Sequence, residues 1–413
     1  MGTTLNDTPS AERTHITFFG RMNSGKSSLV NALAGQEMSI VSKVSGTTTD
    51  PVKKSIEIHG IGPCVLVDTA GFDDTGDLGS MRVSLAKKAA QQADLAVMVF
   101  ADDSEKEPMN QDSDFIYERL WIDLLQKRDT PMVLVINQRG QNGNSQNMAE
   151  KIEAEFQKKP LVVNALTKEG IEELKKELVT AAPGKEAERF ITGDLLCEED
   201  VVLLVMPQDL QAPKGRLILP QVQTLRELLD KKCTAVCTTA DKLEKSLAAF
   251  RQPPKLIITD SQVYKTVYEK KPVQSMLTSF STLFAAYKGD IRYYVQGARV
   301  IGQLKQTDQV LIAECCTHAP LDEDIGRVKL PRLLRKKVGE ELKIDVVSGM
   351  DFPSDLTGYR LVIQCGACMF NRKYVMSRVE AAKSQGIPMT NYGIAIAYLN
   401  GILDQIELTY FDK

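Results

Sequence analysis

The sequence lacks three features that would each assign it to a broad class of protein. No apolar run approaches the roughly 18 residues that a membrane-spanning helix needs. Basic residues are not in excess, since the formal net charge is −3, so nothing predicts a nucleic-acid-binding surface. Residues 1–13 are polar and lack the apolar core of a secretory signal. We therefore expect a protein with neither a membrane nor a nucleic-acid partner.

The absence of a secretory signal also bears on the 8 cysteines of the chain. Without secretion, so many thiols indicate a reducing compartment and roles as ligands or core residues, not as disulfides. We expect a cytoplasmic location. The length of 413 residues predicts two or three domains, each large enough to bury a core of its own.

A phosphate-binding motif stands at residues 20–28, between a strand expected at 14–19 and a helix expected at 29–33. Its sequence, Gly-Arg-Met-Asn-Ser-Gly-Lys-Ser-Ser, is a complete G-x-x-x-x-G-K-S. In such a P-loop the backbone N–H groups wrap the phosphates, Lys26 reaches the β- and γ-phosphates, and Ser27 holds Mg2+. The motif predicts a nucleoside triphosphate site.

Two later motifs follow in the order that a nucleotide switch requires. Residues 46–50, Gly-Thr-Thr-Thr-Asp, offer the hydroxyl of Thr48 to Mg2+ and to the γ-phosphate. After a strand expected at 64–67, Asp68 can hold the metal through water, and the N–H of Gly71 can sense the γ-phosphate. The residues expected to act in hydrolysis are Lys26, Thr48, Asp68 and Gly71.

The base is expected to lie against two loops that follow buried strands. Asn137 closes a strand expected at 132–136, and Asn164-Ala165 follows another at 161–163. The residues expected to bind the nucleotide are Gly20, Asn23, Ser24, Gly25, Lys26, Ser27, Ser28, Asn137, Asn164 and Ala165.

Residues 14–180 resemble the TrmE/Era-like small GTPases, which share the G-R-x-N-x-G-K-S loop and the G-T-T-x-D segment. The resemblance implies that Asn23 binds a K+ ion that stabilises transition-state charge, and that GTP hydrolysis is slow and stimulated by K+. It also implies hydrolysis without a glutamine after D-T-A-G, where this chain has Phe72.

One departure from that family concerns the base. The family's N-K-x-D is Asn137-Gln-Arg-Gly140 here, so two guanine hydrogen bonds lose their carboxylate acceptor. Either guanine selectivity is weakened or a nearby side chain takes over the role.

The rest of the chain divides at a proline pair, Pro253-Pro254. Before it, an apolar strand at 201–206, a helix from Pro220 and a strand at 234–237 form a small α/β unit whose apolar strands suggest burial against a partner. After it, strands and helices alternate, which predicts a parallel sheet with helical crossovers. The strands are expected at 256–259, 309–313, 342–347 and 359–363, and the helices near 261–269 and at 274–287. The predicted fold is α/β in three domains: a P-loop GTPase domain (1–182), a small dimerisation domain (188–253) and a cluster-binding domain (254–413).

Two of these expected strands end in thiols. The apolar run 361–363 leads into a Cys-x-x-Cys, Cys365 and Cys368, with a helix expected at 369–383; the run 311–314 leads into Cys316. Ligands collect at the carboxyl ends of strands in parallel sheets. We therefore expect the two strand ends to share one site.

Several chemistries fit this set of thiols. Three cysteines, Cys316, Cys365 and Cys368, suit an iron–sulfur cluster, with the fourth position left to His318, another group or solvent. Zinc bound by Cys3His is the alternative metal site. The thiols could also be small buried core residues, or Cys365 and Cys368 a redox dithiol.

Three features of the chain together resemble the [FeFe]-hydrogenase maturation GTPases, the HydF family. They are the GTPase motifs, the segment 212–221 (Ala-Pro-Lys-Gly-Arg-Leu-Ile-Leu-Pro-Gln) and the C-x-H…C-x-x-C set. The resemblance implies a scaffold or carrier that binds a [4Fe–4S] cluster and a transient diiron precursor made by two radical-SAM maturases. Such a carrier delivers the diiron unit to apo-[FeFe]-hydrogenase, and it forms a homodimer or a higher oligomer through the central domain.

The family's ligand pattern maps onto Cys316, His318, Cys365 and Cys368, with Gln364 in place of a second histidine. The resemblance therefore implies three cysteine ligands and an exchangeable fourth position, filled by His318 or a labile group. The competing hypothesis is a ribosome- or RNA-associated assembly GTPase with a structural zinc, against which the acidic charge balance counts.

Overall fold

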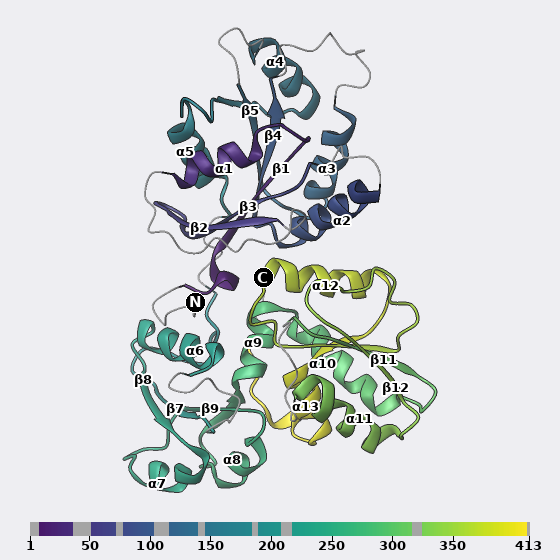
Figure 1. The fold of residues 1–413 in the computed structure, drawn as a ribbon. Coiled ribbons are helices and arrows are strands. Elements are labelled where there is room, and N and C mark those ends of the chain that lie inside the picture. Colours follow the sequence, from purple (N-terminus) through teal and green to yellow (C-terminus); the bar gives the residue numbers. More distant parts are fainter. Residues whose placement is uncertain are drawn as a thin grey trace. The chain divides into compact units, whose positions relative to one another are not determined.

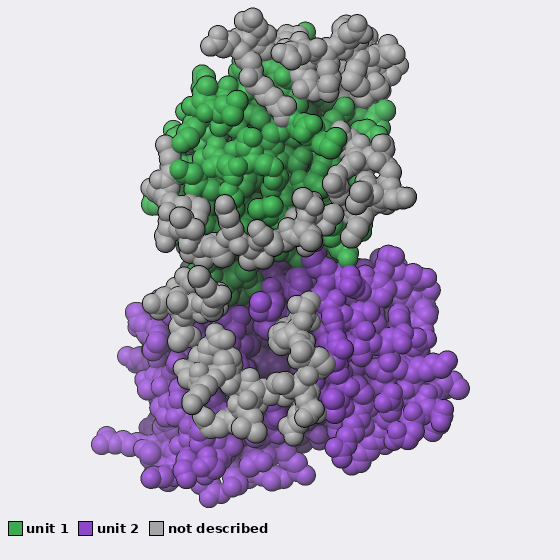
Figure 2. Space-filling view, viewed as in Figure 1, with its two compact units in different colours: residues 1–186 green, residues 187–413 purple. Residues whose placement is uncertain are grey.

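The computed structural model describes residues 8–35, 51–71, 77–102, 115–138, 145–183, 189–207, 217–315 and 324–410. The chain forms two compact units, Met1–Glu186 and Ala187–Lys413, shown in different colours in Figure 2. Within the described ranges no helix has both the length and the apolar character needed to cross a membrane.

The first unit is built on one sheet of six strands, in the order β2-β3-β1-β4-β5-β6 (Figure 1). Strand β2 runs antiparallel to β3, and the other pairs are parallel. The strands are β1 (Thr14–Gly20), β2 (Val52–Ile58), β3 (Gly62–Asp68), β4 (Leu95–Ala101), β5 (Met132–Asn137) and β6 (Leu161–Val163). The helices are α1 (Lys26–Ala34), α2 (Asp77–Gln92), α3 (Ile116–Gln126), α4 (Ser145–Phe156) and α5 (Ile171–Ala181), with a short turn η1 (Ser10–Glu12).

Helices cover both faces of this sheet, as the apolar strands predict. Along β4, Leu95, Val97 and Val99 pack on one face with residues of α1 and α5. The alternate residues of the same strand, such as Met98, pack on the other face with α2, α3 and α4. Side chains of a strand alternate between faces, so a fully apolar strand belongs in the middle of such a sandwich.

The second unit contains two four-stranded parallel sheets, in the orders β10-β9-β7-β8 and β12-β11-β13-β14. The strands are β7 (Val201–Val205), β8 (Thr234–Thr238), β9 (Leu256–Thr259), β10 (Met276–Ser279), β11 (Gln309–Ala313), β12 (Lys343–Val347), β13 (Leu361–Gln364) and β14 (Met389–Asn391). The helices are α6 (Leu219–Asp230), α7 (Leu243–Ala248), α8 (Tyr264–Lys270), α9 (Phe280–Lys288), α10 (Ile291–Val300), α11 (Leu330–Val338), α12 (Arg372–Ser384) and α13 (Tyr392–Leu399). Short helical turns are η2 (Ala240–Lys242), η3 (Ile301–Gln303), η4 (Ile325–Lys329) and η5 (Leu403–Gln405).

The strand pairing corrects two expectations in this unit. The strand at 256–259 does not begin the third sheet, because β9 pairs with β7 and so belongs to the sheet that starts at Val201. Residues 274–287 are not one helix: β10 occupies Met276–Ser279, and α9 begins only at Phe280. Ser279 sets that start, because its hydroxyl caps the helix by accepting from the N–H of Thr282 at 3.2 Å. The proline pair at 253–254 is therefore not a boundary between the sheets.

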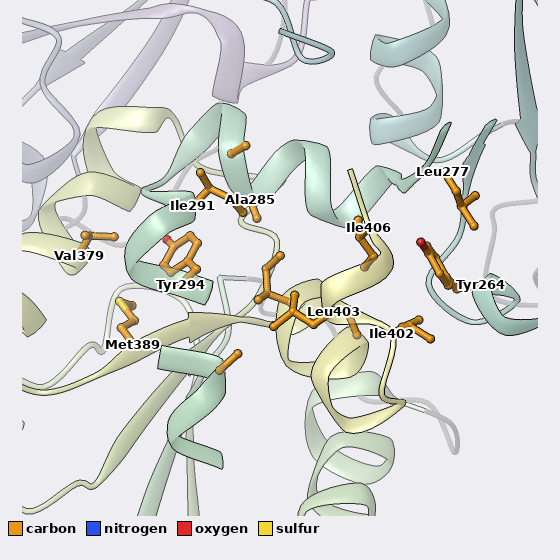
Figure 3. Close-up of a cluster of buried hydrophobic side chains, with 14 of the residues drawn as sticks. Tyr264, Leu277, Ala285, Ile291, Tyr294, Val379, Met389, Ile402, Leu403 and Ile406 are labelled. Carbon is orange, nitrogen blue, oxygen red and sulfur yellow. The ribbon is translucent and has the colours of Figure 1, made fainter. Parts of the chain in front are cut away.

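A single apolar cluster joins the two sheets of this unit. It contains Leu203 and Ile257 of one sheet together with Leu311 and Val362 of the other. Figure 3 shows the C-terminal residues Ile402, Leu403 and Ile406 between Tyr264 and Leu277 on one side and Tyr294, Val379 and Met389 on the other. The chain end is also held by a backbone hydrogen bond of 2.9 Å from Glu407 to Leu277. The two sheets therefore form one packed body.

Candidate nucleotide and thiol sites

The P-loop is positioned by the end of β1 and the start of α1. Gly25 immediately precedes α1 with φ of 90°, a backbone conformation that glycine adopts without strain. Lys26 is 6% exposed, and its Nζ donates to the carbonyl oxygens of Gly20 at 2.9 Å and Arg21 at 2.7 Å. The ammonium therefore lies folded over the loop whose N–H groups are predicted to hold phosphate.

The predicted magnesium residues of the described chain lie together. The hydroxyl of Ser27 donates to Oδ2 of Asp68 at 2.5 Å. Burial raises the pKa of Asp68, while the hydrogen bond from Ser27 and the nearby charges of Lys26 and Lys54 oppose that rise. A hydroxyl and a carboxylate in contact beside a buried lysine suit a divalent cation with a phosphate.

Gly71 brings the D-T-A-G segment against the P-loop. A Cβ atom at Gly71 would lie 2.4 Å from the backbone nitrogen of Met22, so no other residue fits there unchanged. Thr69 holds the same segment in place by donating its hydroxyl to the carbonyl of Phe18 at 2.6 Å. Thr48, the other switch residue, lies outside the described residues.

Asn137 links the P-loop to the loop expected to bind the base. Its Nδ2 donates to the carbonyl of Ser24 at 3.2 Å, and its Oδ1 accepts from the N–H of Ala165 at 3.2 Å. Asn164 shapes that loop, because its Oδ1 accepts from the N–H groups of Leu166 and Thr167. Asn137 therefore joins the P-loop to the loop that follows β6.

A cavity of about 380 Å³ opens at this end of the sheet. It is lined by Gln138, Val162, Val163, Asn164, Glu169, Gly170 and Glu173. Two of these residues are carboxylates, the group that the altered N-K-x-D motif lacks. Gly140, where the motif's carboxylate would be, lies outside the described residues.

Sequence reasoning missed a carboxylate that holds the P-loop. Glu118 of α3 is 3% exposed and accepts from Arg21 twice, from Nε at 2.7 Å and from Nη2 at 2.9 Å. Such a two-point bond to a buried carboxylate fixes the orientation of the guanidinium. Glu118, Trp121, Ile122 and Leu125 form the buried face of α3. These four positions follow the repeat of a helix, and this repeat is the sequence signal that could have placed Glu118 on the buried face.

The two thiol-bearing strands are neighbours, which confirms that their ends share one edge of a sheet. Strand β11 pairs in parallel with β13, with Ala313 opposite Gln364. Beyond that pair, the N–H of Cys315 donates to Sγ of Cys365 at 3.0 Å. Cys316 and His318, the upstream residues expected as ligands, lie outside the described residues.

The Cys-x-x-Cys lies in a loop and not at the first turn of a helix. Helix α12 begins at Arg372 instead of Met369, because the side chain of Asn371 caps it by accepting from the N–H of Tyr374 at 3.3 Å. Ala367, the second of the two residues between the thiols, has φ of 50°. The backbone N–H of Ala367 donates to Sγ of Cys365, with 3.4 Å between nitrogen and sulfur.

The local chemistry of Cys365 fits a thiolate ligand. The pKa of Cys365 is lowered, mainly by the hydrogen bond from the Cys315 thiol and further by the N–H groups of Ala367 and Cys315, against the opposing effect of burial. Gln364 beside it is 1% exposed, and its Oε1 has no hydrogen-bond partner among the described residues. In the described ranges no three His, Cys, Asp or Glu side chains gather closely enough to hold a metal ion.

Comparison with known families covers most of the chain. Residues 191–289 match the hydrogen maturase F dimerization domain, and residues 292–407 match the hydrogen maturase F tetramerization domain. The chain belongs to the hydrogen maturase F (HydF) family. Residues 15–138 of this HydF-family chain match a third family, described as 50S ribosome-binding GTPase.

Individual relatives align with the GTPase part. The tRNA modification GTPase MnmE of Lachnoclostridium phytofermentans is 30% identical over 217 residues, 51% of this chain and 42% of that protein. The MnmE of Chromobacterium violaceum is 35% identical over 170 residues, 41% of this chain and 34% of its own. The chain therefore spans less than half the length of these relatives. A crystal structure of Era with MgGDPNP and 16S ribosomal RNA is 17% identical, covers 55% of this chain and 91% of its own, and has a TM-score of 0.34.

Proposed function

We propose that this protein is a GTP-hydrolysing scaffold and carrier in hydrogenase maturation. It binds a [4Fe–4S] cluster and a transient diiron precursor received from radical-SAM maturases, and it hands the precursor to apo-[FeFe]-hydrogenase. The observation that carries the proposal is the contact between Cys315 and Cys365 at adjacent strand ends, in a chain whose second unit matches two HydF domains. Those matches also support a homodimer or tetramer.

At the nucleotide site, each described residue has a task that its position allows. Lys26 neutralises charge on the β- and γ-phosphates, and the Ser27 hydroxyl holds Mg2+ with Asp68 acting through water. Asn23, at φ of 60°, is assigned the K+ ion. Phosphoryl transfer depends chiefly on positioning and on charge stabilisation, which these residues supply.

At the thiol site, Cys365, Cys368 and Cys316 would hold the cluster, and the fourth position would be left to His318 or to an exchangeable group. When bound, the cluster would supply an iron centre with an exchangeable coordination position. The N–H groups of Cys315 and Ala367 stabilise the thiolate of Cys365 and orient it.

Anaerobic reconstitution of the full chain with ferrous iron and sulfide tests the carrier role. We expect bound iron and sulfide together with the broad visible absorption of a cluster. A colourless protein that instead contains zinc would favour a ribosome-associated assembly GTPase, the alternative to which the match over residues 15–138 points. A Cys365–Cys368 disulfide without metal would favour a redox role.

The missing carboxylate of the base motif predicts poor discrimination of the guanine 2-amino group. A hydrogen bond to a charged acceptor contributes about 1.5–3 kcal/mol, or roughly 10- to 150-fold in affinity. We expect ITP, which lacks that amino group, to displace bound GTP with an affinity within about tenfold of GTP itself. Competition binding with GTP, ITP and ATP measures this.

The matched variant for that experiment is Gly140→Asp, which restores the motif's carboxylate. It should raise the preference for GTP over ITP without changing the affinity for the triphosphate part. A wild-type protein that already prefers GTP by a hundredfold would contradict the prediction. Glu169 and Glu173, at the nearby cavity, would then be the carboxylates to substitute.

A further inference from the structure

Arg378 of α12 is a charged side chain enclosed inside the second unit. It is 2% exposed, and its guanidinium lies 4.9 Å from the ring centroid of Phe352 and 4.8 Å from that of Tyr374. Its Nη2 donates to the carbonyl of Gly349 at 2.5 Å and to the hydroxyl of Tyr374 at 3.1 Å. These contacts fix the position of the group, but all of them are with neutral partners.

A buried guanidinium normally has an anionic partner, because an unpaired charge in the interior is strongly destabilising. Among the described residues, the hydrogen-bond and ring partners of Arg378 include no carboxylate. Its Nε–H has no hydrogen-bond partner in the same set. The structure therefore presents a fixed positive charge without a carboxylate beside it in the described ranges.

The one sulfur contact of Arg378 points to that anion. Its Nη1 donates to Sγ of Cys315 at 3.4 Å. The backbone N–H of Cys315 in turn donates to Sγ of Cys365 at 3.0 Å. One residue thus separates the guanidinium from the Cys-x-x-Cys loop, and all three groups lie at the carboxyl edge of the same sheet or on the helix that follows it.

We propose that Arg378 is a positioning residue that compensates the negative charge of a thiolate-bound iron–sulfur cluster at Cys365 and Cys368. The inference rests on the proposed cluster-binding function. Thiolate ligands make such a cluster anionic, and one-electron reduction adds a further negative charge. A nearby buried cation therefore stabilises the bound cluster and favours its reduced form.

The test compares Arg378→Gln, which removes the charge, with Arg378→Lys, which keeps it. Both full-length variants are reconstituted anaerobically with ferrous iron and sulfide and titrated with dithionite, with the reduced cluster followed by EPR. In Arg378→Gln we expect the ratio of reduced to oxidised cluster at a fixed potential to fall at least tenfold, a shift of about 59 mV for a one-electron couple. Iron loss to a chelator should be at least tenfold faster. In Arg378→Lys both quantities should stay within about threefold of wild type.

The matched control is Arg299→Gln, since Arg299 is an exposed arginine of α10 that pairs with Asp404. If Arg378→Gln matches this control in both the reduction and the iron-loss measurements, the inference is overturned. The inference is also overturned if Arg378→Lys loses iron as fast as Arg378→Gln, because the side chain would then act through its shape and not through its charge. Circular dichroism of the metal-free variants checks folding. If Arg378→Gln does not fold, Arg378→Lys tests the inference alone: values within about threefold of wild type in both readouts support it, and larger losses overturn it. A wild-type protein that takes up no iron or sulfide would refute the proposed function itself.

Discussion

Lys26→Ala is expected to abolish GTP hydrolysis and to leave the iron content of the reconstituted protein unchanged. The Lys26 ammonium lies over the P-loop, donating to the carbonyls of Gly20 and Arg21, where it can turn to the phosphates. Removing one preorganised group that stabilises transition-state charge typically costs about 10²–10³ in rate. We expect a loss of at least about a hundredfold in phosphate release at saturating GTP.

Lys176→Ala is the matched control, because Lys176 is an exposed lysine of α5 in the same unit. It should hydrolyse GTP at the wild-type rate. The cluster should persist in Lys26→Ala because the P-loop and the Cys-x-x-Cys belong to different compact units. Loss of both hydrolysis and iron from this one substitution would contradict the independence of the two sites.

The nucleotide site could be predicted from the sequence because its chemistry is carried by short contiguous motifs. The P-loop needs only a strand, a glycine-rich turn and a helix in that order, and β1 and α1 provide them. The structure supplies the register between the motifs, since β1 lies beside β3 as a parallel pair. Ser27 and Asp68, 41 residues apart, therefore meet.

The residues that sequence reasoning missed depend on contacts between distant elements. Glu118 and Arg378 are charged residues on helices, and charged helical residues are usually exposed. Their burial follows from partners that no local pattern shows: Arg21 of the P-loop for Glu118, and the ends of β11 and β12 for Arg378. The burial of such a charge can be recognised only once the positions of the neighbouring strand ends are known.

Sequence reasoning also could not predict which strands belong to which sheet. The apolar run of β9 fits the interior of any parallel sheet, so its composition does not say which one. The pairing of β9 with β7 decides this, and it places strands from both sides of the proline pair in one sheet. By contrast, β11 and β13 were predicted to end at one edge because each carries a thiol at the same point, and they do.

Cys365→Ser and Cys368→Ser are each expected to remove most of the iron and sulfide that the wild-type chain binds on reconstitution. A serine hydroxyl stays protonated at neutral pH and is a poor ligand for iron, whereas the thiolate of Cys365 is stabilised by the N–H groups of Cys315 and Ala367. GTP hydrolysis should remain at the wild-type rate. Iron and sulfide analysis with visible absorption spectra measures the first effect, and phosphate release the second.

Cys237→Ser provides the control for loss of a thiol, because Cys237 is an exposed cysteine of β8, in the other sheet of the same unit. It should bind iron as wild type does. The cavity left by an oxygen in place of sulfur is small, so the metal-free Cys365 and Cys368 variants should fold, and their circular dichroism should match that of metal-free wild type. Full iron content in both variants would place the metal elsewhere. In that case the contact between the buried Cys315 and the partly buried Cys365 would be one of packing alone, and Arg378 would still require an anion.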